Sequence, residues 1–425
     1  MIITVKQGNT IYSLSRLYSL PVSKIISDNG IKNETIVVGQ SLIIDIPDDF
    51  LIAEQTTTVK NISQALDITQ RSLFQNNYFL SGRQDIKKGD YVVLSYKTLP
   101  QQEKIIGGYA YSFISQQILF SVMNYLTYII PFTYGFTKEG ELISLETYGI
   151  LKEAQNSGTG ALMHISTLTD EGYFDNTLPH FIFTDETARR RLINNIISEI
   201  IEKGYDGADI DFEFLTAEQK EDYIAFTKEL YNSLHDIGKI LVIAVPPMNS
   251  KEQRGILFDG IDYESLGQNA DYIMIMAYEY GYKFGPPLAI APVNQIVRVL
   301  DYAISVIPNE KILLGVANYG YDWTLPYIRG ESDAPSISTV EAIELAKRYG
   351  AEIMFDEIAM APYFFYTDSD NKAHEVWFED ARSIAAKMNL IKEYNLAGGF
   401  IWDLMRENPQ AYVTINSEVK IHQTS

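Results

Sequence analysis

The feature that most limits the fold is a regular alternation of short apolar segments with longer amphipathic ones, which begins near Lys104. Eight segments have the length and composition of buried strands: 105–111, 126–132, 161–165, 207–212, 240–245, 272–278, 312–317 and 398–402. Stretches such as 188–203 and 217–237 read as the helices between them. Eight β/α repeats over roughly 300 residues predict an α/β fold of the (β/α)8 TIM-barrel type. A doubly wound open sheet is the alternative, but it usually has fewer strands, and no dinucleotide-binding glycine motif is present.

The gap between the seventh and eighth predicted strands is the longest of the series, running from Ile312 to Gly398. We therefore expect a small α+β insertion at about 324–380, on the face where such barrels carry their sites. Within it, two strand-like runs flank Asp368-Ser-Asp-Asn, which is a turn signal.

Composition excludes several classes of function. The chain has 425 residues with 34 basic and 55 acidic side chains, a net charge of −21, which disfavours nucleic acid as a partner. It contains no cysteine, so disulfides, thiolate metal sites and cysteine nucleophiles are excluded. The N-terminus lacks the features of a signal peptide, and the apolar runs are too short to span a bilayer. We expect no association with membranes. We also expect the protein to be made without a signal peptide.

The first hundred residues contain a weak internal repeat, with copies at 1–47 and 51–97. Asn29 corresponds to Asn77 and Gly39 to Gly89, and each copy predicts the order strand, helix, helix, strand. The first copy, VKQGNTIYSLSRLYSLPVSKIISDNGI…VVGQSLII, resembles a LysM module, a family that binds glycans containing N-acetylglucosamine. The second copy is more divergent and has lost the opening polar-Gly-Asn-Thr stretch, so whether it binds glycan stays open.

The LysM resemblance implies a sugar site between two loops of the first copy. The residues that match the family's binding loops are Gly8, Asn9, Thr10, Asn29, Gly30 and Ile31. The same residues are also consistent with a turn and helix cap at 8–10 and a helix stop at 29–30. Both roles can coexist, because LysM recognition uses backbone groups of those turns.

The strongest chemical signal is a run of carboxylates on the fourth predicted strand. Side chains alternate along a strand, so Asp209, Asp211 and Glu213 share one face and would line the barrel interior, with Glu213 at its mouth. Carboxylates this close should share protons and raise at least one pKa, which suits protonation of a leaving group. A solvated strand face and a calcium or magnesium site are the alternatives.

The spacing Asp206-x-x-Asp209-x-Asp211-x-Glu213 resembles the D-x-x-D-x-D-x-E motif of family 18 glycoside hydrolases in full. That resemblance implies a retaining, substrate-assisted mechanism, in which the 2-acetamido oxygen of the sugar attacks its own anomeric carbon. Glu213 would protonate the departing oxygen and then activate water. Asp211 would hydrogen-bond the acetamido N–H, and Asp209 would share a proton with Asp211.

Other strand ends also resemble this family. Met276-Ala-Tyr278-Glu279 is similar to its M-x-Y-D motif with Glu in place of Asp, which implies that Tyr278 positions the acetamido oxygen. Tyr109, Met276, Glu279 and Trp402 are the further candidates for substrate binding. The third strand, ALMHIST, lacks the Gly-Gly ending of many members. The histidines, at 164, 180, 235, 374 and 422, show no metal-ligand spacing, so we expect neither metal nor cofactor.

Two LysM-like copies before a family 18 barrel at 103–425 resemble the SleL-type spore cortex-lytic N-acetylglucosaminidases. The resemblance implies a monomeric hydrolase of peptidoglycan or cortex fragments, located in the coat and cortex region of the spore and active in germination. A chitinase is one alternative. A non-catalytic, chitinase-like glycan-binding spore protein is the other, although the intact Asp211 and Glu213 argue against it.

Overall fold

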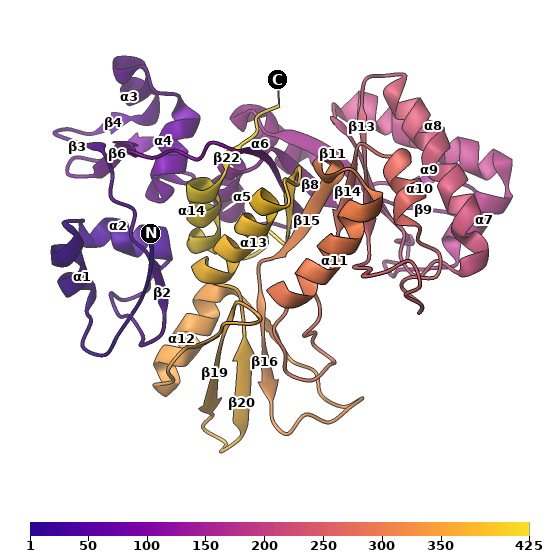
Figure 1. Cartoon of the computed structure of the whole chain (residues 1–425). Helices are drawn as coiled ribbons and strands as arrows, with labels where there is room; N and C mark the ends of the chain where they lie inside the picture. Colours follow the sequence, from indigo (N-terminus) through magenta and orange to yellow (C-terminus); the bar gives the residue numbers. More distant parts are fainter. Residues whose placement is uncertain (425) are drawn as a thin grey trace.

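The computed structural model describes residues 1–424, and its central feature is a closed parallel barrel (Figure 1). Eight parallel strands follow one another around the barrel in chain order, and the last pairs with the first. They are β7 (Glu103–Tyr111), β8 (Tyr128–Phe132), β11 (Gly160–Ser166), β12 (Gly207–Asp211), β13 (Ile240–Val245), β14 (Tyr272–Ile275), β15 (Ile312–Ala317) and β21 (Gly398–Trp402). A short strand, β22 (Lys420–Ile421), adds to the start of β7. The predicted TIM barrel is confirmed.

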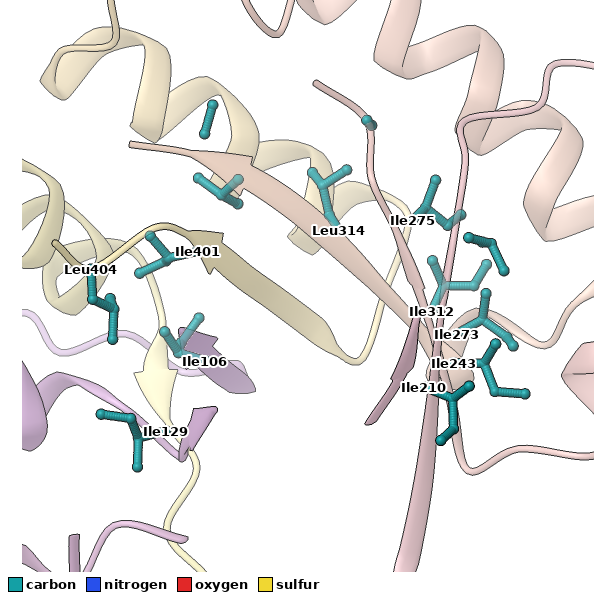
Figure 2. Packing of buried hydrophobic residues seen from close by; sticks show 14 of the residues in the cluster. Ile106, Ile129, Ile210, Ile243, Ile273, Ile275, Ile312, Leu314, Ile401 and Leu404 are labelled. Atoms are coloured by element: carbon teal, nitrogen blue, oxygen red, sulfur yellow. The ribbon is translucent and has the colours of Figure 1, made fainter. Parts of the chain in front are cut away.

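Helices surround the barrel because alternate strand residues point outward and are apolar. Ile210, Ile243, Ile273 and Leu314 belong to this outer layer (Figure 2), where they pack under the helices. The helices between and after the strands are α5 (Gln116–Val122), α6 (Tyr148–Ser157), α7 (Leu178–Thr184), α8 (Glu186–Lys203), α9 (Lys220–His235), α10 (Tyr263–Gln268), α11 (Val293–Val306), α13 (Ala381–Glu393) and α14 (Pro409–Glu418). Short 3-10 turns lie at Met123–Tyr125, Ala217–Gln219 and Asn309–Lys311.

The strand predictions agree with the structure except at some ends. Three strands, those at 240–245, 312–317 and 398–402, have the predicted bounds. The largest difference is in the sixth strand, which was expected to reach Tyr278 but ends at Ile275. Beyond it the backbone leaves the ladder and turns, and Glu279 adopts a φ of +63°. An apolar run continuing through 276–278 hides this change of direction from sequence analysis.

The insertion after β15 is a five-stranded antiparallel sheet with one helix, seen below the barrel in Figure 1. Its elements are β16 (Gly320–Thr324), β17 (Ser336–Ile337), α12 (Thr339–Tyr349), β18 (Met354–Asp356), β19 (Ala361–Thr367) and β20 (Ala373–Trp377). The sheet order is β17-β16-β20-β19-β18. The predicted turn at Asp368–Asn371 joins β19 to β20, and the insertion has its own core around Phe364 and Val376.

Two small α+β units precede the barrel, and the first has the predicted order strand, helix, helix, strand, whereas the second contains four strands. The first comprises β1 (Ile2–Thr4), α1 (Ile11–Tyr18), α2 (Val22–Asn29) and β2 (Ser41–Ile43). The second comprises β3 (Asp49–Ile52), β4 (Thr57–Thr58), α3 (Val59–Leu66), α4 (Gln70–Asn76), a 3-10 turn (Tyr78–Leu80), β5 (Asp85–Ile86) and β6 (Tyr91–Ser95). Asn29 and Asn77 have the same role: each buried amide bridges the end of its second helix to the last strand of its unit.

Both small units are docked on the barrel rather than held by a free linker. The buried Gln410 on α14 donates to Asn29 Oδ1 (3.0 Å) and to the Ser41 carbonyl (2.7 Å). Val37 of the first unit joins the apolar core of the insertion. The second unit is held through Arg71 and Gln75, which donate to backbone carbonyls of Leu126 and Asn124. No helix among residues 1–424 is long and apolar enough to cross a membrane.

Candidate active site

The three predicted carboxylates lie at the C-terminal end of β12. Asp209 and Asp211 point into the barrel while Ile210 points out, and Glu213 follows two residues after the strand ends. Asp209 is completely buried, and the Asp211 side chain is 16% exposed. Both oxygens of Asp209 and one oxygen of Asp211, Oδ1, are buried and have no hydrogen-bond partner. Buried carboxylates with free acceptor sites are costly, which is typical of a functional site rather than a structural one.

Burial changes the acidity of these groups. The pKa of Glu213 rises to about 8 because the carboxyl group is largely removed from water and lies near Asp211. Burial also raises the pKa of Asp209 to about 6, opposed by the nearby His164 and reinforced by Asp211. At neutral pH Glu213 is therefore mostly a carboxylic acid, the form that donates a proton.

These acids open into a pocket of about 310 Å³ at the mouth of the barrel. Its lining includes Asp211, Glu213 and five further predicted site residues of the barrel, Tyr109, Met276, Tyr278, Glu279 and Trp402, whereas Asp209 lies beneath the pocket and does not line it. The Trp402 ring contacts Phe132 (centroids 4.9 Å apart) and Tyr109 (5.6 Å), both edge-on. The indole thus belongs to a rigid aromatic floor, a surface on which a pyranose ring can stack.

Tyr278 is held against the acids from the sixth-strand side. Burial raises its pKa well above the ordinary value, and Asp211 and Glu213 contribute, so the phenol stays protonated and can donate. Gly315 makes room for the ring, because a Cβ at that position would lie 2.7 Å from Tyr278 Cε1. Glu279 lies at the rim, where Oε1 accepts hydrogen bonds from Tyr319 and from Tyr321, the latter at 3.0 Å.

Asp206, the first acid of the motif, lies away from the pocket. It precedes β12, and its Oδ2 accepts a hydrogen bond from the Ala161 N–H on β11 at 2.8 Å. Asp271 does the same before β14, where its Oδ2 accepts from Leu241 N–H at 2.8 Å. These two aspartates fix neighbouring strands at the N-terminal end of the barrel, so Asp206 sets the register of the strand that carries the other acids.

Sequence analysis missed the wall that β11 contributes. His164, Ser166, Thr167, Phe174 and Asn176 all line the pocket. The imidazole of His164 lies beside the acids, with Nε2 3.7 Å from Asp209 Oδ2 and 3.8 Å from Asp211 Oδ2. The only sequence signal for His164 was its position inside an otherwise apolar strand. The spacing of the five histidines gave no sign that His164 differs from the other four.

The six candidate glycan-binding residues of the first small unit fall into two groups. Gly8 and Asn9 form the turn before α1, and Thr10 caps the helix by accepting from Ser13 N–H at 3.0 Å. Asn29 and Gly30 lie on the side that faces the barrel and the insertion, and Ile31 belongs to the apolar core of the unit itself. The Asn29 amide is buried and bonded within the unit and to Gln410, and Gly30 lies against Pro409 and Val340.

Metal binding has no support in the described part of the chain. Among residues 1–424 no group of three or more histidine, aspartate and glutamate side chains is arranged to hold a metal ion.

Comparison with known proteins places the chain in a family. The model of Glycosyl hydrolases family 18 matches residues 75–407, and the LysM domain model matches residues 3–45. The cortical fragment-lytic enzyme of Bacillus subtilis (strain 168) is 32% identical, over 99% of this chain and 98% of its own. The chain belongs to glycosyl hydrolases family 18.

Solved structures are similar over the whole chain or over the barrel. The spore cortex-lytic enzyme SleL of Bacillus megaterium QM B1551 is 33% identical with a TM-score of 0.84, covering 100% of this chain and 99% of that one. A chitinase of Chromobacterium violaceum is 25% identical with a TM-score of 0.69, covering 74% of this chain and 98% of its own. The first likeness thus includes both small N-terminal units.

Proposed function

We propose that this chain is a retaining N-acetylglucosaminidase that cleaves peptidoglycan fragments of the spore cortex after N-acetylglucosamine. The observation that carries the proposal is the pairing of a buried acid, Glu213, with Asp211 and Tyr278 around one pocket above an aromatic floor. The cortical fragment-lytic enzyme and SleL, similar over nearly their whole length, support the choice of cortex as substrate.

The chemistry follows from the side chains. Glu213, with its pKa raised to about 8, protonates the oxygen of the leaving sugar. The acetamido oxygen of the substrate, positioned by the Tyr278 hydroxyl, attacks the anomeric carbon and forms a cyclic oxazolinium intermediate. Asp211 accepts a hydrogen bond from the acetamido N–H and balances the positive charge. Glu213, now a carboxylate, takes a proton from water as that water opens the ring, so configuration is retained.

The small N-terminal units tether the enzyme to its polymer. The first, in which the LysM model matches residues 3–45, binds glycan through backbone groups of the loop at Gly8, Asn9 and Thr10, whereas Asn29 and Gly30 pack against the barrel and the insertion. The second, at 51–97, is a divergent copy of the same module. Tethering raises the local concentration of the barrel on an insoluble polymer without any new contact at the active site. The protein acts as a monomer in the coat and cortex region of the spore.

A chitinase is the second candidate, favoured by the likeness of the barrel to the Chromobacterium violaceum chitinase. Both activities need an N-acetylated sugar on the non-reducing side of the broken bond, so the catalytic groups do not separate them.

Mass spectrometry of spore-cortex fragments, reduced with borohydride after digestion, distinguishes these functions. We expect new N-acetylglucosaminitol ends with the wild type and none with Glu213→Gln. Cleavage of chitin oligomers alone would assign a chitinase instead. If neither substrate were cut while glycan was still retained, the chain would be a binding protein and the proposal would fail.

A further inference from the structure

His164 occupies a place in the site that the three acids alone do not explain. It lies on β11 directly beside Asp209 in the strand register, and its side chain is 1% exposed. Its Nε2 faces one oxygen of each aspartate, at 3.7 Å from Asp209 and 3.8 Å from Asp211. The other charged or titratable neighbour is Tyr109 on β7, whose ring meets the imidazole edge-on at 5.5 Å. Phe132 on β8 packs against it at 4.7 Å.

The hydrogen bonds on the far side of the ring are compatible with a proton on either nitrogen, and the carboxylates beside Nε2 favour one of the two tautomers. Nδ1 is 2.6 Å from Thr133 Oγ1, and that hydroxyl also lies 2.9 Å from Ser166 Oγ and 3.0 Å from the Tyr134 carbonyl oxygen. If Thr133 donates to Nδ1 and accepts from Ser166, the ring proton sits on Nε2 and points at the two carboxylates. The opposite tautomer would aim the Nε2 lone pair at two acidic oxygens, which is electrostatically unfavourable.

We propose that His164 is a positioning residue whose Nε2–H, oriented by Thr133 and Ser166, balances the negative charge of the Asp209–Asp211 pair. This inference rests on the proposed function. When Asp211 turns toward the acetamido N–H of the substrate, Asp209 is left behind in the dry barrel interior. His164 Nε2, 3.7 Å from Asp209 Oδ2, is the N–H that stabilises the carboxylate of Asp209 there as Asp211 turns away.

The first test is kinetic. His164→Leu removes the donor, so Asp209 holds its proton to higher pH, and the acid limb of kcat/KM should move up by about one pH unit or more. We expect kcat to fall at least about tenfold with KM little changed. The acid limb of His164→Gln, which keeps an N–H donor, should lie between those of the wild type and His164→Leu. Thr133→Val should shift the acid limb in the same direction as His164→Leu, but by less.

A matched control lies on the same strand. Met163→Leu changes a fully buried residue that faces the helices and nearly conserves volume, so its pH profile should equal that of the wild type. If Thr133→Val kept the wild-type acid limb, the inference would be wrong even if His164→Leu failed to fold.

The second test does not depend on activity. The ¹⁵N resonances of the imidazole in the intact protein, assigned with His164→Gln, should show a protonated Nε2 and an unprotonated Nδ1 at neutral pH. A neutral ring protonated on Nδ1 would overturn the inference. A wild type that cleaves no glycan would overturn the proposed function instead, while the ring tautomer would still decide the role of His164.

Discussion

At the residue scale, the site consists of a few carboxylates that are largely removed from water and lie next to one another. Glu213 remains an acid at neutral pH because burial and Asp211 raise its pKa to about 8. Asp211 stays partly exposed, in reach of a ligand, whereas Asp209 is sealed behind it. Different burial thus gives neighbouring carboxylates on one strand different roles, although sequence alternation makes them look equivalent.

The raised pKa of Glu213 predicts a stability cost that depends on pH. Its pKa rises from an ordinary 4.5 to about 8 on folding, so ionisation opposes the folded state, and the wild type loses stability as pH rises through that window. Glu213→Gln should match the wild type in free energy of unfolding at pH 4 and exceed it by about 4 kcal/mol at pH 8. Urea unfolding at both pH values measures this. The exposed Glu221→Gln on α9 is the control, and a difference independent of pH would contradict the account.

At the element scale, the strand ends decide what the sequence could and could not reveal. Alternation along β12 predicted that Asp209 and Asp211 point inward, because a strand offers only two faces. The contribution of β11 could not be predicted in the same way. His164, Ser166 and Asn176 reach the pocket because of the register of β11 against β12 and the course of the following loop. Local residue preferences determine neither the register nor the course of the loop. The early end of β14 at Ile275 could not be predicted either, because the apolar run continues through 276–278.

Close packing between strands makes the position of Tyr278 testable from β15. A methyl group at Gly315 would lie 2.7 Å from both Tyr278 Cε1 and the Ile275 carbonyl oxygen, so Gly315→Ala must displace the ring. We expect kcat to fall at least about tenfold, because small shifts of a positioning group are costly. Gly149→Ala on α6, where a Cβ meets nothing within 4 Å, should leave kcat unchanged. Equal kcat for both variants would show that the placement of Tyr278 does not matter.

At the scale of the whole molecule, the small units and the barrel form one packed body. The repeat in the sequence predicted two βααβ units but gave no sign of how they attach, because the contacts join residues hundreds of positions apart. Gln410 reaches Asn29 and Ser41, and Ile353 donates to the Val38 carbonyl at 3.0 Å. Gly39, with a φ of +86°, lies so close to Ile353 that no side chain fits there. These contacts fix the orientation of the first unit relative to the barrel.

Removing the link at Gln410 should loosen the first unit without unfolding the barrel. Gln410→Leu leaves the buried Ser41 carbonyl without its donor, a cost of about 1–3 kcal/mol. Hydrogen–deuterium exchange should increase across residues 1–47 and stay unchanged in the barrel strands. Gln155→Leu, on the exposed face of α6, should change neither region. Uniform acceleration over the whole chain would mean that docking and barrel folding cannot be separated.

The central claim is that Asp211, Glu213 and Tyr278 cleave a glycan with the help of the substrate's own acetamido group. The most direct measurement compares cleavage of one cortex fragment in two forms, N-acetylated and de-N-acetylated at the sugar before the scissile bond, by mass spectrometry of the products. The account predicts rapid cleavage of the acetylated form and a rate at least about a thousandfold lower for the other, since its internal nucleophile is gone. Comparable rates would contradict it.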